Sequence, residues 1–190
     1  MIELKPERIL KEYSAVLSRA LTDVSKTGPK NYRTIELALD EFQGLGIDAI
    51  KSTKTYLKLI DLFLSYTDPC VYWFEIRSPT EVKGIWNSFG EYKARKLRTV
   101  PYKKKVMPED TNVLYLGKVK KGLLRRLKEH LGYTDSVKTQ SLQLIHWALG
   151  YGIKIKIHVM EFEQETSNLV GVFEFKLARE IRPLLGRHST

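Results

Sequence analysis

The 190-residue chain contains one cysteine, Cys70, and four histidines. A single cysteine can neither close an internal disulfide nor supply the thiolates of a structural zinc site. No apolar run approaches the roughly 20 residues that a membrane span needs, and the opening MIELKPERIL lacks the apolar segment of a signal peptide. We therefore expect a cytoplasmic protein that has no membrane partner.

Positive charge, by contrast, is abundant. The chain has 32 Lys and Arg residues against 22 Asp and Glu, a net charge of +10 at pH 7. Such an excess favours a polyanionic partner, because contacts with phosphates release condensed counterions. The alternative is a soluble basic protein without such a partner. The hydrophobic share of 43% is ordinary for a globular protein, so we expect a packed core.

Residues 1–68 are predicted to form a helical N-terminal region. Apolar residues recur at three- and four-residue spacing near 9–21, 34–42 and 51–66, which indicates three helices. Glycine and proline at 28–29 and glycines at 44 and 46 separate these helices.

Residues 69–190 have a different pattern. Short apolar or alternating stretches predict strands at 71–76, 112–116 and 153–159, and helical spacing predicts helices at 122–131, 139–149 and 169–182. The strands follow one another too closely for a doubly wound parallel sheet. The expected fold is therefore α/β of the α+β type, with a small, mostly antiparallel three-stranded sheet flanked by helices.

A long basic insert at about residues 78–111 separates the first two predicted strands. Aromatic residues are interleaved with its cations, a combination that suits nucleic-acid backbones and bases. We predict that the insert contacts nucleic acid through Lys93, Arg95, Lys96, Arg98, Lys103, Lys104 and Lys105, and that Arg125 in the following helix also does so.

Two tyrosines lie inside predicted strands, in the strings Cys70-Val71-Tyr72 and Tyr115-Leu116-Gly117, the second followed by Lys118. Downstream come an Arg-x-x-x-His pair, Arg126 and His130, and then Glu174 nine residues before Pro183. This ordered set resembles the GIY-YIG nuclease family over about residues 70–188. The chain departs from that pattern at Cys70, which replaces the first glycine, and at Gly186, where many members carry Asn. The arginine also sits about one residue later than usual, which leaves Arg125 as a competing assignment.

The residue types suit phosphodiester hydrolysis on chemical grounds as well. Glu174 can hold one Mg²⁺ or Mn²⁺, hard cations that take carboxylate oxygen and keep several waters. Arg126 can bind non-bridging oxygens. Tyr72, with Tyr115 close behind, can act as the base if cations depress its pKa from about 10. His130 can pass the proton on or orient the water, and Lys118 can contact phosphate or lower a tyrosine pKa.

The sequence therefore predicts a metal-dependent endonuclease of the GIY-YIG type that cleaves DNA, with RNA left open as substrate. The N-terminal helices and the insert favour a restriction-type or other stand-alone enzyme slightly over a fragment of a repair complex. The competing interpretation is a binding protein on the same scaffold that holds DNA or RNA without cutting. One site of this kind cuts one strand, so a homodimer is a further expectation.

Overall fold

The computed structural model describes residues 6–77, 82–133 and 136–187. Residues 78–81, where the predicted insert begins, and the last three residues of the predicted second domain lie outside this part. Six α-helices and four strands are present among the described residues. In chain order they are α1 (Pro6–Thr27), β1 (Asn31–Ala38), α2 (Ile47–Ile50), α3 (Lys54–Phe63), β2 (Cys70–Ile76), α4 (Val82–Ala94), β3 (Val113–Val119), α5 (Leu123–Leu131), β4 (Lys154–Glu161) and α6 (Val170–Ile181).

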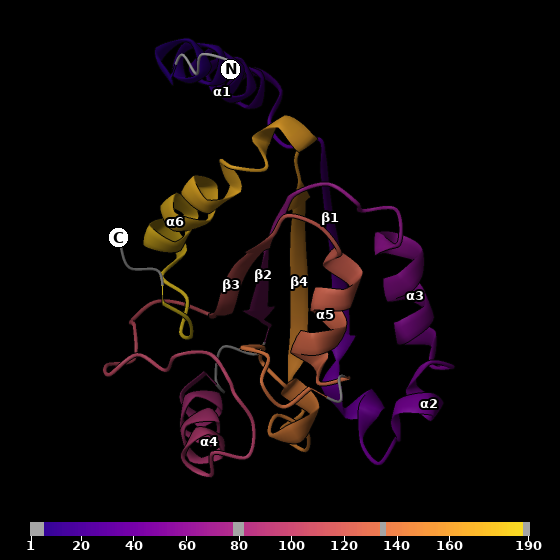
Figure 1. Ribbon diagram of the computed structural model, residues 1–190. Coiled ribbons are helices and arrows are strands. Elements are labelled where there is room, and N and C mark those ends of the chain that lie inside the picture. Colours follow the sequence, from indigo (N-terminus) through magenta and orange to yellow (C-terminus); the bar gives the residue numbers. More distant parts are fainter. Residues whose placement is uncertain (1–5, 78–81, 134–135, 188–190) are drawn as a thin grey trace.

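The strands form one antiparallel sheet in the order β1-β4-β2-β3 (Figure 1). The α+β class is as predicted, but the sheet has four strands rather than three. The extra strand is β1, which lies in the segment predicted to be helical. Ile35 and Leu37 satisfy a helical spacing with Leu39 and Phe42, and they also alternate with Thr34 and Glu36. Pairing with β4 decides the outcome, because Ile35 opposes Ile157 and Leu37 opposes Ile155.

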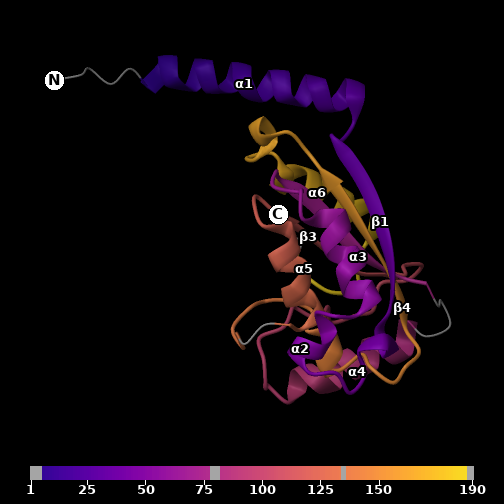
Figure 2. The same cartoon turned by 90° about the vertical axis from the view of Figure 1, so that its right-hand side faces the viewer.

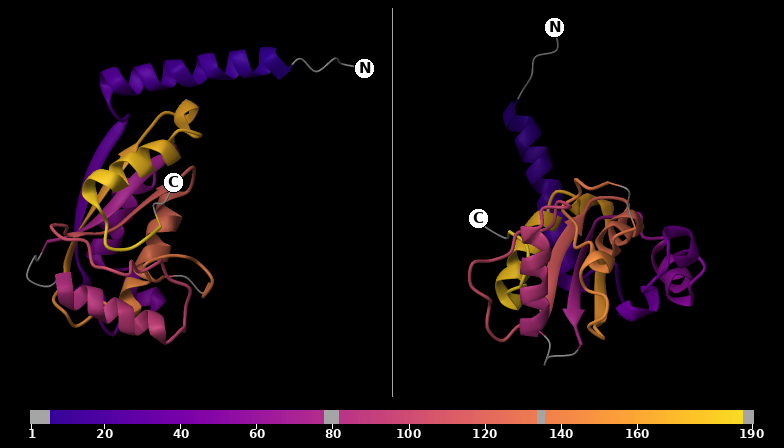
Figure 3. Two further views of the ribbon diagram at one scale, coloured as in Figure 1. Left: turned by 90° about the vertical axis from the view of Figure 1, so that its left-hand side faces the viewer. Right: turned by 90° about the horizontal axis from the view of Figure 1, so that it is seen from below.

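Helices cover both faces of the sheet (Figure 3). On one face, Tyr72 and Phe74 of β2 pack into a large core with α3 and α5, whose contributions include Leu59 and Leu127. On the other face, Val71 packs into a smaller core with α6. Hydrophobic residues from both sides of residue 68 share the larger core, so the N-terminal part is built into the sheet domain.

Helix α1 is the exception to this packing, since it runs well past the body of the domain (Figure 2). Its C-terminal half contacts the short 3-10 helix Gln164–Thr166, and Ala20 is buried there. Its N-terminal half exposes apolar side chains such as Ile9 and Leu10. None of the helices in the described ranges combines the length and hydropathy that crossing a bilayer requires.

The predicted helix at 139–149 is wrong. This segment forms only a 3-10 turn, Leu144–His146, preceded by Gln143 in the left-handed region with φ of 57°. The backbone N–H of Leu142 donates to Nδ1 of His130, 3.1 Å away, and the Leu142 carbonyl accepts from the Trp147 indole at 2.7 Å. The first bond ties this segment to α5. The His146 N–H, which a helix would direct to the Leu142 carbonyl, instead donates to the Gln143 carbonyl at 3.0 Å.

Strand β3 lies at the edge of the sheet, and the chain after α6 returns to it. The backbone N–H groups of Leu184 and Leu185 donate to the carbonyls of Val113 and Leu114 at 2.8 and 2.9 Å. The next N–H, that of Gly186, donates to the carbonyl of Tyr102 at 2.8 Å. Residues 184–187 are thereby fixed beside β3 and beside the insert.

Candidate active site

Tyr72 and Tyr115 lie side by side on the face of the sheet that α5 covers. Tyr72 opposes Gly117 and Phe74 opposes Tyr115 in the β2–β3 register, and the two phenol rings are 6.5 Å apart between centroids. Gly117 allows this approach. A Cβ there would lie 2.8 Å from Cε1 of Tyr115 and 2.8 Å from the Tyr72 hydroxyl. The absence of a side chain at Gly117, the glycine of the Tyr-Leu-Gly motif, therefore leaves the space that the two rings occupy.

Helix α5 brings Arg126 and His130 to the Tyr72 hydroxyl. Nε2 of His130 is 3.0 Å from this oxygen, and Nε of Arg126 donates to it at 3.3 Å. Because Nδ1 of His130 accepts from the Leu142 N–H, a neutral imidazole carries its proton on Nε2 and donates it to Tyr72. The Tyr72 oxygen thus accepts two hydrogen bonds, one of them from a cation.

Burial governs the protonation of this cluster. It raises the pKa of Tyr72 and of Tyr115, and the neighbouring Arg126 guanidinium partly opposes both shifts. Burial, reinforced by the charge of Arg126, holds the pKa of His130 well below its usual range. At neutral pH the cluster therefore contains protonated phenols, a neutral imidazole and one fixed positive charge.

The competing arginines have different positions. Arg126 has a side chain only 20% exposed and donates from Nη1 to Glu129 at 2.8 Å and from Nη2 to the Gln140 carbonyl at 2.8 Å. Arg125 is 70% exposed and donates to the other oxygen of Glu129. The structure therefore places Arg126 in the cluster and Arg125 on the surface.

Glu174 reaches the same region from α6 on the other side of the sheet edge. Its carboxylate is 2.5 Å from Nζ of Lys118 on β3, and its side chain is 16% exposed. Glu174 and Tyr115 line one cavity of about 320 Å³. The phenols and the carboxylate, which come from opposite faces, thus converge at the edge of β3.

Two further cations line this cavity, Lys93 from the end of α4 and Arg187 from the segment after α6. The Arg187 guanidinium lies 4.9 Å from the centre of the Tyr102 ring. Burial, with a smaller effect from Arg187, lowers the pKa of Lys93. Sequence reasoning missed Arg187, Tyr102 and Gln140. The one available signal was the position of Arg187 directly after Gly186, at the end of the family pattern.

The donor set suits only a particular class of metal. Within the described ranges, no group of three or more His, Cys, Asp or Glu side chains is placed to hold a metal ion. Glu174 offers a single carboxylate that faces an open cavity. A hard cation such as Mg²⁺ or Mn²⁺, which keeps several waters and takes phosphate oxygens, fits this arrangement better than Zn²⁺.

The cations predicted for nucleic-acid binding in the insert are spread over several environments. Lys93 donates to the Pro101 carbonyl at 2.8 Å, Lys103 lies 4.6 Å from the Trp86 ring centre, and Arg98 donates to Gln143 at 3.4 Å. Burial lowers the pKa of Lys104. Arg95, Lys96 and Lys105 are exposed. The insert also contains α4, a helix that the sequence pattern did not predict.

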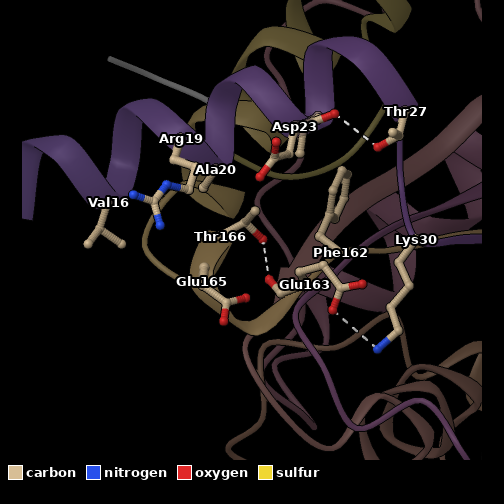
Figure 4. Close-up of a pocket in the computed structure, with 12 residues that line it drawn as sticks. Val16, Arg19, Ala20, Asp23, Thr27, Lys30, Phe162, Glu163, Glu165 and Thr166 are labelled. Carbon is tan, nitrogen blue, oxygen red and sulfur yellow. Dashed lines mark hydrogen bonds and ion pairs between the residues drawn. The ribbon is translucent and has the colours of Figure 1, made fainter.

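A second cavity, of about 450 Å³, lies between α1 and residues 162–166 (Figure 4). Arg19, Asp23 and Glu165 line it together with Phe162, and Lys30 pairs with Glu163 at 3.4 Å on its rim. Its lining includes no histidine, cysteine or tyrosine. Tyr115 and Glu174, which the sequence pattern singled out, line the β3 cavity and not this one. Comparisons with protein-family models, with curated proteins and with solved structures give no match for the chain.

Proposed function

We propose that the chain is a metal-dependent endonuclease of the GIY-YIG type, which hydrolyses DNA phosphodiester bonds at the β3 cavity. One observation carries this proposal: Tyr115 and Glu174 line the cavity, and His130, Tyr72 and Arg126 form a bonded cluster against the Tyr115 ring. The five residues come from four separate elements. Such hydrolysis needs an activated water, positive charge near the phosphoryl oxygens and help for the leaving oxygen. This constellation has a residue for each requirement.

The two phenols act as a unit in taking the proton of the attacking water. Tyr115 lines the cavity, whereas Tyr72 has no exposed surface and lies behind it. Negative charge is best accommodated on Tyr72, whose oxygen accepts from both Arg126 and His130. Because burial raises the pKa of both phenols, each keeps its proton until the substrate and its cation add positive charge. The pair would then lose one proton to solvent through the cavity at Tyr115, and the resulting phenolate would take the proton of the attacking water.

Glu174 would hold that cation, which supplies Lewis-acid charge at the phosphate and lowers the pKa of water. When no cation is bound, Lys118 neutralises the charge of the Glu174 carboxylate. Lys93 and Arg187 add fixed positive charge on the cavity wall, where non-bridging oxygens of a phosphate would be held. His130, buried and neutral, orients Tyr72 through the proton on Nε2.

The test is nicking of supercoiled plasmid in Mg²⁺ or Mn²⁺ by the wild type and by Glu174→Gln, which keeps the shape and removes the charge. Glu180→Gln is the matched control, because Glu180 is an exposed carboxylate on the same helix that also pairs with a lysine. We expect the first variant to lose activity by about 10²-fold or more and the control to retain it. Equal activity of wild type and Glu174→Gln would remove Glu174 from the site.

A non-cleaving nucleic-acid-binding protein is the second candidate. The observation that favours it is the ion pair between Lys118 and Glu174, since a lysine already occupies the carboxylate that the metal would need. A gel shift of DNA by the wild type, with no nicking in either metal, would establish this alternative. Structured RNA in parallel reactions tests the RNA-cleaving version, and sedimentation of the active species tests the expected homodimer.

A further inference from the structure

We propose that the basic turn between β3 and α5, residues Lys120, Lys121 and Arg125, binds the nucleic-acid backbone a few nucleotides from the cleaved bond. This inference rests on the proposed function, because it names the surface that presents the substrate to that site. We call these three residues the turn patch. The partner that we propose is the phosphate backbone of duplex DNA.

Charge density singles out this segment. Residues 118–130 contain six Lys and Arg residues and a single carboxylate, Glu129. Half of the net charge of +10 therefore resides in thirteen consecutive positions. Electrostatic contacts with phosphates supply most of the sequence-independent affinity for DNA, so a concentration of this kind is where a backbone is held.

The side chains of the turn patch point to solvent. Lys120 and Lys121 are exposed, and Nζ of Lys120 donates to the neutral amide oxygen of Asn168 at 2.7 Å. Arg125 is 70% exposed. A cation bound to a neutral group or to water gives up little when a phosphate replaces that partner, so the charges of Lys120 and Lys121 are available for a ligand. Arg125 pairs with the Glu129 carboxylate, which Arg126 also binds, so one carboxylate is shared by two guanidinium groups.

In the predicted insert Arg95, Lys96 and Lys105 are exposed as well, but other cations of the insert contact the protein itself. Lys93, Lys103 and Arg98 each interact with a carbonyl, a ring or an amide of the protein itself. Their distribution suggests that much of the charge of the insert holds α4 and its following loop in place. Of the two basic segments, the turn patch is the one whose charges are mostly at the surface.

The patch is also directly connected to the site. It follows β3, which carries Tyr115 and Lys118, and precedes Arg126 on α5. Five residues of extended chain from Tyr115 to Lys120 span about 17 Å at roughly 3.3 Å each. One strand of DNA rises about 3.4 Å per nucleotide. The turn patch would therefore contact phosphates about five nucleotides from the one at Tyr115.

The experiment measures the salt dependence of binding to a fluorescent 30-base-pair duplex, with Glu174→Gln as background to prevent cutting. Lys120→Ala/Lys121→Ala is compared with Lys54→Ala/Lys58→Ala, an equal charge change at exposed lysines on α3. Each lost phosphate contact lowers the slope of log K against log salt by about 0.9 for duplex DNA. We expect a decrease of about 1.8 for the first pair and no more than a few tenths for the control.

If the slope is the same for both pairs, the proposal that the turn patch binds DNA is wrong. The proposed function is not affected by that result, because plasmid nicking by the wild type is measured separately. If the slope decreases with structured RNA but not with duplex DNA, the patch binds RNA, and the proposal that it binds DNA is wrong. Thermal denaturation of both double variants, expected to match the background protein, shows that the difference arises from binding.

Discussion

Replacing Gly117 by alanine tests the geometry of the site without any assumption about activity. The added Cβ would lie 2.8 Å from Cε1 of Tyr115, 2.8 Å from the Tyr72 hydroxyl and 3.0 Å from Cζ of Tyr72. Carbon atoms in favourable contact are about 3.5–4.0 Å apart, so at least one ring must move. Tyr72 has little freedom to do so, because it is fully buried and bonded to His130 and Arg126.

Overpacking of this kind costs about 1–3 kcal/mol, against a gain of about 0.4–1 kcal/mol because alanine restricts the unfolded chain. For a protein of this size, each kcal/mol shifts the melting temperature by about 2–4 °C. We therefore expect Gly117→Ala to melt several degrees lower than the wild type and to lose nicking activity, since at least one of the two phenols is displaced.

Gly84→Ala is the matched control. Gly84 lies in helix α4, and a Cβ there would meet nothing within 4 Å. Alanine at an exposed helical position stabilises by about 0.5–1 kcal/mol, so this variant should melt slightly higher than the wild type. The reasoning is refuted if Gly117→Ala is as stable and as active as Gly84→Ala, as judged by circular dichroism melting and plasmid nicking.

Two further predictions concern the hydrogen bonds around Tyr72. Tyr72→Phe leaves the buried Nε2–H of His130 without its acceptor, so unfolding by urea should show a loss of about 1–3 kcal/mol together with reduced nicking; unchanged stability would mean that the bond does not form. Because burial lowers the pKa of His130, the unfolded chain binds more protons than the native one below about pH 6.5. Wild-type stability should therefore fall between about pH 7 and pH 5, and fall less steeply in His130→Gln. His146 and His158, whose pKa values are also lowered, contribute equally to both proteins, so parallel stability curves would exclude His130 as the cause.

Local pattern was sufficient for much of the fold. The strands β2, β3 and β4 and the helices α1, α3, α5 and α6 all lie close to where apolar spacing placed them. In β4, for example, Ile155, Ile157 and Val159 face the core as the alternation predicts. The i,i+4 spacing of Arg126 and His130 also predicts that both side chains lie on one face of α5, and both contact the Tyr72 hydroxyl there.

The misses share a different cause. The segment of β1 fits two periodicities, and only its pairing with β4 selects the strand. At residues 139–149, the bond from Leu142 to His130 competes with helix formation. Arg187 enters the cavity only because the segment after α6 pairs with β3 and Tyr102. Each of these depends on contacts between distant parts of the chain, which spacing along the sequence does not reveal.

The outermost strand of a sheet is where foreign chains can add themselves and begin to aggregate. In this protein Leu184 and Leu185 already pair with the beginning of the outer edge of β3, at the carbonyls of Val113 and Leu114. A proteolytic cut between the end of α6 and Leu184 would release them and uncover carbonyl groups flanked by apolar residues, and the nicked protein would then be open to intermolecular sheet extension. Resistance to aggregation thus depends on the same segment that carries Arg187 to the cavity.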